Sequence, residues 1–351
     1  MKQGKPTIAT PARFKETKLS VLNTLGRSHL DRTMFFDTPV DIVRYDTVKY
    51  PIFETLAERQ DSYFWRPQEI ALPLDREQFD AMPQAHKHSF TSTLQRQIIL
   101  DSGNSRSPLL AFLPICSLPE VENWMEKWGY FEGIHNKSYT HIIRNVYNDP
   151  GEVFDGIMQV KEIVDCAKDI SKYYDDLIDL NNFRNDPKYH QYGILRTHKE
   201  ALWMALNAAN ALEGIRFYIS FACSWVFNEN QLMEGNAKII KMICRDENLH
   251  LSVTQHILRL LPKDDPEFED IRRKLMPEVL AMVADVVEQE KAWAKYVFKY
   301  GSILGLHEKS ACEFIEYRAD KCLKALGYPA KYGRVTNPLP WTDKYISGKD
   351  V

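Results

Sequence analysis

The chain has 351 residues, of which 44% are hydrophobic and 26% are charged, and its formal net charge is -3. This composition is typical of a globular protein, and the scattered lysines and arginines give no basis for nucleic-acid binding. No apolar run approaches the roughly 20 residues that cross a bilayer, and residues 1–20 lack the apolar core of a signal peptide, so we expect a cytoplasmic protein. The six cysteines occur singly, which argues against a zinc ribbon, a thioredoxin-like pair or a disulfide framework.

The first part of the chain is predicted to form an extended arm followed by three helices. Residues 1–38 are polar and interrupted by prolines, which indicates an extended arm. Residues 41–65 are predicted to form a first helix that ends before Pro67, because the residue before a proline disfavours the helical conformation. Residues 82–102 form a second predicted helix. A third runs from 119 to 147, opens at Pro119 and stops at the Asn-Asp-Pro sequence that follows it.

The remainder of the chain also has helical patterns. Residues 152–183 are predicted to be helical, and residues 198–227 form a segment so apolar on every side that we place it in the middle of the domain. Further helices are expected at 229–261, 267–299 and 306–326. Because strand alternation and a glycine-rich phosphate loop are both absent from the sequence, we predict one all-α domain at 39–328, followed by a C-terminal extension at 329–351.

Two copies of the pattern E-x-x-H provide the first chemical signal. Glu132 and His135 lie three residues apart in the third predicted helix, and Glu247 and His250 repeat the spacing later in the chain. A step of three residues brings two side chains to nearly the same face of an α-helix. A carboxylate and an imidazole one turn apart are a natural pair of metal ligands. One copy alone is weak evidence, because such pairs usually lie on solvated surface, but two copies favour a metal centre.

Two isolated carboxylates complete a ligand set. Asp101 and Glu213 occur in otherwise apolar helical surroundings. Two helices with E-x-x-H and two with a single carboxylate are the ligand-bearing parts of a ferritin-like dimetal-carboxylate bundle. Four carboxylates and two imidazoles suit iron or manganese, whereas zinc and copper sites normally use more nitrogen or sulfur. The alternative is that Asp101 and Glu213 are buried acids with Arg or Lys partners, because an unpaired buried carboxylate is costly.

A tyrosine is expected close to these ligands. Tyr139 follows His135 by one turn on the same stripe of the third helix. Apolar residues four and eight positions from Glu213 and Glu247 share the stripes of those two ligands: Phe217, Phe221, Ile239 and Ile243. If the ligands point inward, these residues enclose a phenol beside the metals. Such a shielded position suits a tyrosyl radical, although an ordinary packed core produces the same spacings.

At these residues the chain closely resembles the small, radical-bearing subunit of class I ribonucleotide reductase. The resemblance runs from about Phe35 to Trp341. It rests on motifs in the family's order and spacing: RYD (44–46), FWRP (64–67), LLAFLPICSLPE, EGIHNKSYTHIIRN, LEGIRFYISFACS, MEGNAKII, RDENLHL and NPLPW. Motifs of this length, correctly spaced, are highly specific.

The resemblance implies roles for individual residues. Two metal sites are implied, one formed by Asp101, Glu132 and His135 and the other by Glu213, Glu247 and His250. Bridging is implied mainly for Glu132 and Glu247. The radical would reside on Tyr139, in an apolar pocket formed by Phe217, Phe221 and Ile243. Trp65 and Asp246 would carry oxidising equivalents to the surface through His135, although Trp65 could simply be a packed aromatic and Asp246 an acid that orients the ligand histidine.

The resemblance also implies a function. Two iron ions per chain, with manganese as an alternative, would use O2 to oxidise Tyr139. The radical would then pass to a large catalytic subunit that reduces ribonucleoside diphosphates to deoxyribonucleotides for DNA synthesis. A homodimer is implied as well. Members of the family carry a flexible tail with a radical-transfer tyrosine beyond NPLPW. Tyr345 lies too close to Trp341 to match that tyrosine. Either residues 329–351 are the beginning of a longer tail, or this form does not dock normally on the large subunit.

Three other functions fit part of the pattern. A ligand-binding Mn/Fe oxidase shares the six ligands but does not need the route through Trp65 and Asp246. An iron-storage or purely structural bundle would form no tyrosyl radical. A manganese-dependent relative could retain Tyr139 without oxidising it.

Overall fold

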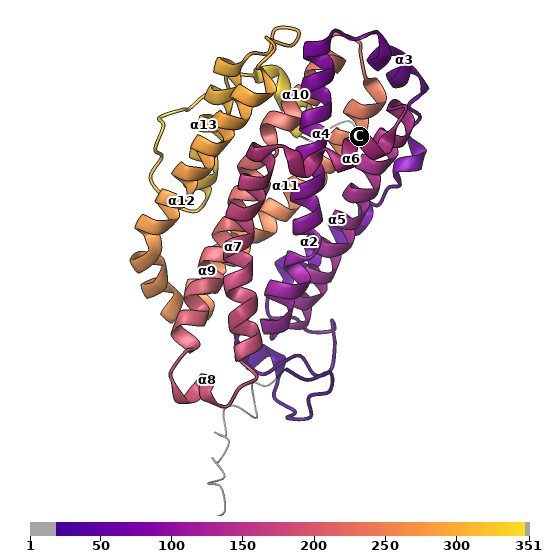
Figure 1. Cartoon of the computed structure of the whole chain (residues 1–351). Helices are drawn as coiled ribbons and strands as arrows, with labels where there is room; N and C mark the ends of the chain where they lie inside the picture. The colour runs from indigo at the N-terminus through magenta and orange to yellow at the C-terminus, as the bar shows by residue number, and fades with distance from the viewer. Residues whose placement is uncertain (1–18, 348–351) are drawn as a thin grey trace, which may run out of the picture.

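The computed structural model describes residues 19–347, which form an elongated bundle of helices (Figure 1). Within this range no strand is present, and only two isolated bridges occur, Phe35 with Cys116 and Ile303 with Leu306. The α-helices are α2 (Pro51–Ser62), α3 (Pro73–Ala81), α4 (Gln84–Asn104), α5 (Pro119–Val146), α6 (Pro150–Asp155), α7 (Lys161–Phe183), α8 (Lys188–Gln191), α9 (Leu195–Ala211), α10 (Tyr218–Glu229), α11 (Glu234–Asp264), α12 (Glu267–Val297), α13 (Glu308–Ala325) and α14 (Asp343–Ile346). Two π-helical turns, η3 (Pro108–Phe112) and η6 (Leu212–Arg216), and several short 3-10 turns lie between them. The predicted all-α fold is confirmed.

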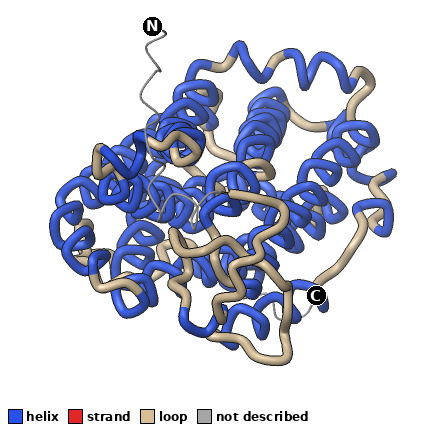
Figure 2. The backbone as a smooth tube through the Cα atoms, turned by 90° about the horizontal axis from the view of Figure 1, so that it is seen from below, coloured by secondary structure: helices blue, strands red, loops and turns tan. Residues whose placement is uncertain are grey.

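Four segments form the centre of the bundle: α4, α5, α11 and the pair α9–α10 joined by η6. Helix α4 packs against α5 and α10, and α11 packs against α5, α9 and α10. Figure 2 looks along the bundle, so the long helices are seen close to end-on. Every residue from Tyr218 to Phe227 in α10 is buried, as expected for the apolar segment placed in the middle of the domain. Helices α7, α12 and α13 pack around α9.

The first helix begins ten residues later than predicted. Residues 41–50 are irregular, and α2 starts at Pro51. Proline at the first helical position is favourable, but it disfavours the helical conformation of the residue before it, here Tyr50. The backbone amides of Lys49 and Tyr50 instead donate hydrogen bonds to Glu120 Oε1 at 3.0 and 2.9 Å. Glu120 at the start of α5 therefore fixes the entry to α2.

Four other features differ from the sequence prediction. Residues 73–81 form α3, which was not predicted, and the predicted helix 152–183 is divided into α6 and α7 by a 3-10 turn. Pro262 lies inside the last turn of α11 and does not end it. The predicted helix 198–227 is interrupted by η6, which contains Glu213. The last difference matters for the metal centre.

Met34, Phe35 and Phe36 near one end of the described range and Tyr345 near the other are buried in the core. Within residues 19–38 only the short 3-10 turn His29–Asp31 is helical, and residues 1–18 of the expected arm lie outside the described range. Near the other end, Tyr345 is buried; its ring stacks on Trp225 with 5.0 Å between centroids, and its hydroxyl donates to Glu229 Oε1 at 2.6 Å. None of the helices in the described part is both long enough and apolar enough to span a membrane.

Candidate metal centre

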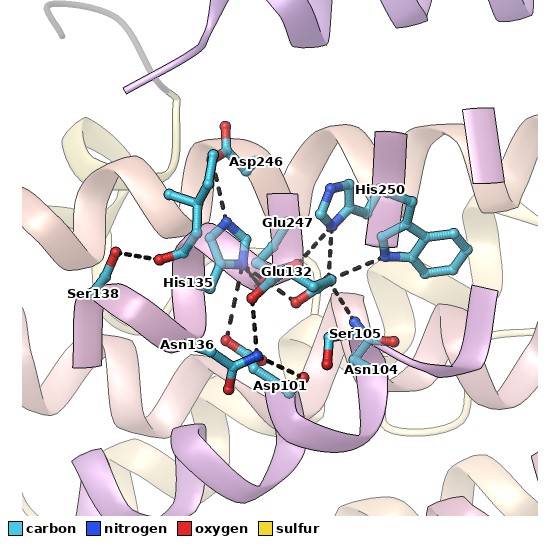
Figure 3. Close-up of polar contacts among 12 residues, drawn as sticks. Asp101, Asn104, Ser105, Glu132, His135, Asn136, Ser138, Asp246, Glu247 and His250 are labelled. Atoms are coloured by element: carbon cyan, nitrogen blue, oxygen red, sulfur yellow. Dashed lines mark hydrogen bonds and ion pairs between the residues drawn. The ribbon is translucent and has the colours of Figure 1, made fainter. Parts of the chain in front are cut away.

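The structure brings the six predicted ligands together in the middle of the bundle. All six side chains are fully buried. They come from four packed segments: Asp101 from α4, Glu132 and His135 from α5, Glu213 from η6, and Glu247 and His250 from α11. Figure 3 shows five of them pointing toward one another across the space between α4, α5 and α11.

The ligands divide into two overlapping groups. One contains Asp101, Glu132, His135 and Glu247, and the other contains Glu132, Glu213, Glu247 and His250; within each group one ligand atom per residue lies within 4.8 Å of all the others. Glu132 and Glu247 belong to both groups, which is the arrangement that bridging carboxylates require. His135 Nδ1 lies 3.3 Å from Glu132 and 3.1 Å from Glu247, while His250 Nδ1 lies 3.1 and 3.0 Å from the same two residues.

Buried oxygens without partners indicate that cations belong here. Each carboxylate retains one buried oxygen with no hydrogen-bond partner: Asp101 Oδ1, Glu132 Oε2, Glu213 Oε2 and Glu247 Oε1. Every ion pair recorded for these carboxylates joins them to a histidine. Among the described residues, no Arg or Lys forms an ion pair with Asp101 or Glu213, so the alternative of such partners is wrong. Because desolvated carboxylates are costly unless compensated, the donor set fits two ions held by oxygen and nitrogen ligands.

The pKa shifts of the clustered side chains also indicate that cations bind here. Burial raises the pKa of Asp101 and of Glu213 well above the usual carboxyl range, and neighbouring carboxylates add to the effect. Burial alone would lower the pKa of His250, but hydrogen bonds to Glu132 and Glu247 outweigh it and raise the pKa to about 9. Without metal the cluster therefore retains protons that neutralise its charge, and bound cations would displace them.

Two polar residues beside the ligands, Asn104 and Trp128, were not predicted from the sequence to belong to the site. Asn104 Nδ2 donates to Glu132 Oε1 at 2.7 Å and to Glu213 Oε1 at 2.8 Å, so it links ligands of two helices. Trp128 Nε1 donates to Glu132 Oε1 at 3.1 Å. Asn104 stands three residues after Asp101, on nearly the same helical face, and this spacing was the signal that could have identified it.

Tyr139 lies at the edge of the cluster. Its side chain is fully buried, and its hydroxyl donates to Asp101 Oδ2 at 2.6 Å. Burial and the charge of Asp101 raise the pKa of the phenol well above its usual value, so Tyr139 holds its proton at neutral pH. Phe217, Phe221 and Ile243 are also fully buried, and the two phenyl rings stack with 5.6 Å between centroids.

A hydrogen-bonded chain connects the cluster with Trp65. Asp246 Oδ2 lies 3.2 Å from His135 Nε2 and accepts from Trp65 Nε1 at 2.9 Å, and all three side chains are buried. Gln60 Nε2 donates to the other oxygen of Asp246 at 3.3 Å. If Asp246 accepts a proton from His135 Nε2, a neutral His135 keeps its Nδ1 lone pair facing the carboxylates, which is the form that binds a metal ion.

The bundle and the carboxylate–histidine cluster at its centre place this chain in the ferritin-like class of helical proteins. A family model described as "Ribonucleotide reductase, small chain" matches residues 43–338. The chain belongs to this family.

Relatives agree with the family match. The chain is 46% identical to the ribonucleoside-diphosphate reductase subunit beta of Buchnera aphidicola (subspecies Acyrthosiphon pisum), over 95% of this chain and 91% of that protein. It is 44% identical to the reductase 1 subunit beta of Escherichia coli O157:H7, over 92% and 88% of the two chains. Among solved structures, the R2 subunit from Clostridium botulinum superposes with a TM-score of 0.80 at 24% identity, over 93% of this chain and 98% of that one. A dimanganese(II) protein from Streptococcus sanguinis has a TM-score of 0.73 at 19% identity, over 88% and 99% of the two chains.

Binding of Mn(II) is expected to raise the thermal stability of the metal-free protein. Each ion that binds only the folded state adds about 2.7 kcal/mol when free metal is 100 times its Kd, so two independent ions would add about 5 kcal/mol. Differential scanning calorimetry of metal-free protein with increasing Mn(II) measures this gain. A His250→Ala variant should show about half of it, and an equal gain in both proteins would contradict the two-ion site.

Proposed function

We propose that this chain is the radical-generating small subunit of a ribonucleoside-diphosphate reductase, in which Tyr139 carries a tyrosyl radical. The observation that carries the proposal is the position of the Tyr139 phenol. It is shielded from water and hydrogen-bonded at 2.6 Å to Asp101, which itself belongs to the candidate metal centre. A structural or iron-storage bundle has no need of a buried phenol bonded to a candidate ligand.

The chain's own residues control the oxidation of the phenol. Two iron ions held by the six candidate ligands would, together with O2, supply the one-electron oxidant. A tyrosine that loses an electron becomes strongly acidic and must release its proton to a nearby base. Asp101 Oδ2 is the acceptor within reach at 2.6 Å, and Asp101 Oδ1, which has no protein partner, remains for a metal ion. The apolar side chains of Phe217, Phe221 and Ile243 are proposed to keep water and reductants from the radical.

Trp65 is proposed to pass the oxidising equivalent from the centre toward the surface. The path His135–Asp246–Trp65 has hydrogen-bond separations of 3.2 and 2.9 Å and is buried along its length. Phe64, adjacent to Trp65, is 55% exposed, so the path ends just below the surface. A large catalytic subunit that binds there would receive the radical and would provide the substrate site.

The metal, the assembly and the domain limits belong to the same proposal. Iron is the proposed metal, with manganese as the alternative, because four carboxylates and two imidazoles suit both ions. The chain is proposed to act as a homodimer in the cytoplasm. Its functional domain is proposed at residues 39–328, between an N-terminal arm and a C-terminal extension.

Nucleotide reduction distinguishes this function from that of a ligand-binding oxidase. Full-length protein loaded with Fe(II), exposed to O2 and mixed with its large subunit is expected to convert a ribonucleoside diphosphate to the deoxyribonucleotide. Omission of either subunit or of metal should abolish the product, measured by chromatography of the nucleosides. If a loaded and folded protein gives no product with an active large subunit, an oxidase without radical transfer is the better assignment.

A further inference from the structure

The segment that carries Glu213 has an unusual backbone. Residues Leu212–Arg216 form the π-helical turn η6 between α9 and α10. A π-turn adds a residue to the helix and shifts hydrogen bonds to the i to i+5 pattern, which disturbs the regular pairing of carbonyl groups. Such turns are strained relative to the α-helix and persist where surrounding contacts support them. The contacts around η6 are therefore informative about how Glu213 is held.

Arg318 of α13 supports η6 from one side. Its Nε donates to the backbone oxygen of Gly214 at 3.1 Å, inside the protein. Its guanidinium carbon lies 3.5 Å from the ring centroid of Tyr218, the first residue of α10, in a cation–π contact. A Cβ atom on Gly214 would lie 2.3 Å from Cys322 Sγ. Helix α13 therefore packs directly on the turn, and only glycine allows the approach.

Arg216, within the turn, supports η6 from another side. Its Nη2 donates to Asp169 Oδ2 on α7 at 2.7 Å, and its Nη1 donates to Gln289 Oε1 on α12 at 2.8 Å. The same Nη1 lies 3.7 Å from Glu290, which also forms an ion pair with Arg96 of α4. These contacts join η6 directly to α7 and α12, and through Glu290 to α4, and none of them involves a metal ligand.

We propose that Arg318 and Arg216 are positioning residues that hold η6 in its π-helical form, so that Glu213 faces His250 before any ion binds. Glu213 Oε1 stands 3.8 Å from His250 Nδ1 in this arrangement. The inference rests on the proposed dimetal centre and adds to it the means by which one ligand is fixed. Residues that orient metal ligands typically change affinity by about 10- to 100-fold when removed.

Mn(II) binding to full-length Arg318→Ala tests the proposal. Wild-type protein should bind two Mn(II) ions per chain, measured anaerobically by calorimetry, with the EPR spectrum of a coupled pair. Arg318→Ala should weaken one of the two ions by about tenfold or more and leave the other nearly unchanged. Hydrogen exchange of the amides at 212–218, measured without metal, should become faster in the same variant.

Arg184→Ala is the matched control. Arg184 is equally buried and also donates to backbone oxygens, those of Pro114 and Asp37, but it does not contact η6. It should leave the two Mn(II) affinities and the exchange at 212–218 unchanged, even if its Tm falls as far as that of Arg318→Ala. If Arg318→Ala does not fold, Arg318→Gln and Arg216→Lys provide the same comparison.

Two results would overturn the inference. One is wild-type Mn(II) affinity and wild-type exchange in the Arg318 variant, and the other is an equal loss of affinity in Arg184→Ala. A third result would separate the two proposals. If the wild-type protein bound no Mn(II) pair while the amides of η6 remained protected, the proposed dimetal centre would be wrong, but the support of η6 by the two arginines would stand.

Discussion

Tyr139→Phe is expected to abolish the tyrosyl EPR signal and to reduce nucleotide reduction to background. The substitution removes one hydroxyl group and retains the ring, so the buried packing around it should persist. Phenylalanine is far harder to oxidise than tyrosine and has no proton to give to Asp101, which now accepts from the phenol at 2.6 Å. EPR after Fe(II) and O2, together with product assay in the presence of the large subunit, measures both losses.

Tyr218→Phe is the matched control for this variant. Tyr218 is also fully buried, and its hydroxyl donates to Asn248 Oδ1 at 3.0 Å, a residue that is not among the candidate ligands. Phenylalanine keeps the ring that Arg318 contacts, so Tyr218→Phe should retain both the signal and turnover. Persistence of the tyrosyl signal in Tyr139→Phe would reject Tyr139 as the radical residue, and a full signal without turnover in wild type would favour a relative that does not transfer its radical.

Trp65→Phe is expected to separate radical formation from radical use. The variant loses the indole N–H that donates to Asp246 at 2.9 Å and replaces an oxidisable ring with one that is not. The Tyr139 signal should form, because the six candidate ligands are untouched. Nucleotide reduction should fall by at least about 100-fold, which corresponds to about 2.7 kcal/mol in the activation free energy. Stopped-flow absorption for the radical and a product assay for turnover report the two steps separately.

The control for Trp65→Phe is Trp203→Phe. Trp203 is as buried as Trp65, but its indole nitrogen has no hydrogen-bond partner. The control should keep its turnover, so that a loss specific to Trp65 reflects the path and not the packing of a large ring. Full turnover in Trp65→Phe would remove Trp65 from the transfer route.

Local spacing was sufficient to predict the candidate ligands. Glu132 with His135, and Glu247 with His250, are fixed by one helical turn each, and any helix at those positions presents both side chains on one face. The apolar surroundings of Asp101 and Glu213 then identified the other two ligand-bearing segments. The spacing carries no information on how the four segments pack. It therefore could not predict that Glu132 and Glu247 would be common to both groups of ligands.

The periodicity of side chains along a helix could not predict the π-helical turn η6. The stripe from Glu213 to Phe217 and Phe221 assumed a straight α-helix, whereas η6 adds a residue and shifts the phase by about 100°. Phe221 is nevertheless buried, because every residue of α10 from Tyr218 to Phe227 is buried, and Phe217, just before α10, is buried as well. The support for η6 comes from Arg318, more than 100 positions away from Gly214 in sequence. No local pattern contains such a contact.

The central claim is that six side chains from four segments hold two metal ions beside Tyr139, and anomalous X-ray scattering tests it most directly. Crystals soaked anaerobically with Fe(II) and measured at the iron edge should show two peaks per chain. One peak is expected within coordination distance of Asp101, Glu132 and His135 Nδ1, and the other within coordination distance of Glu213, Glu247 and His250 Nδ1. A single peak, or peaks located away from these side chains in a fully soaked crystal, would contradict the account.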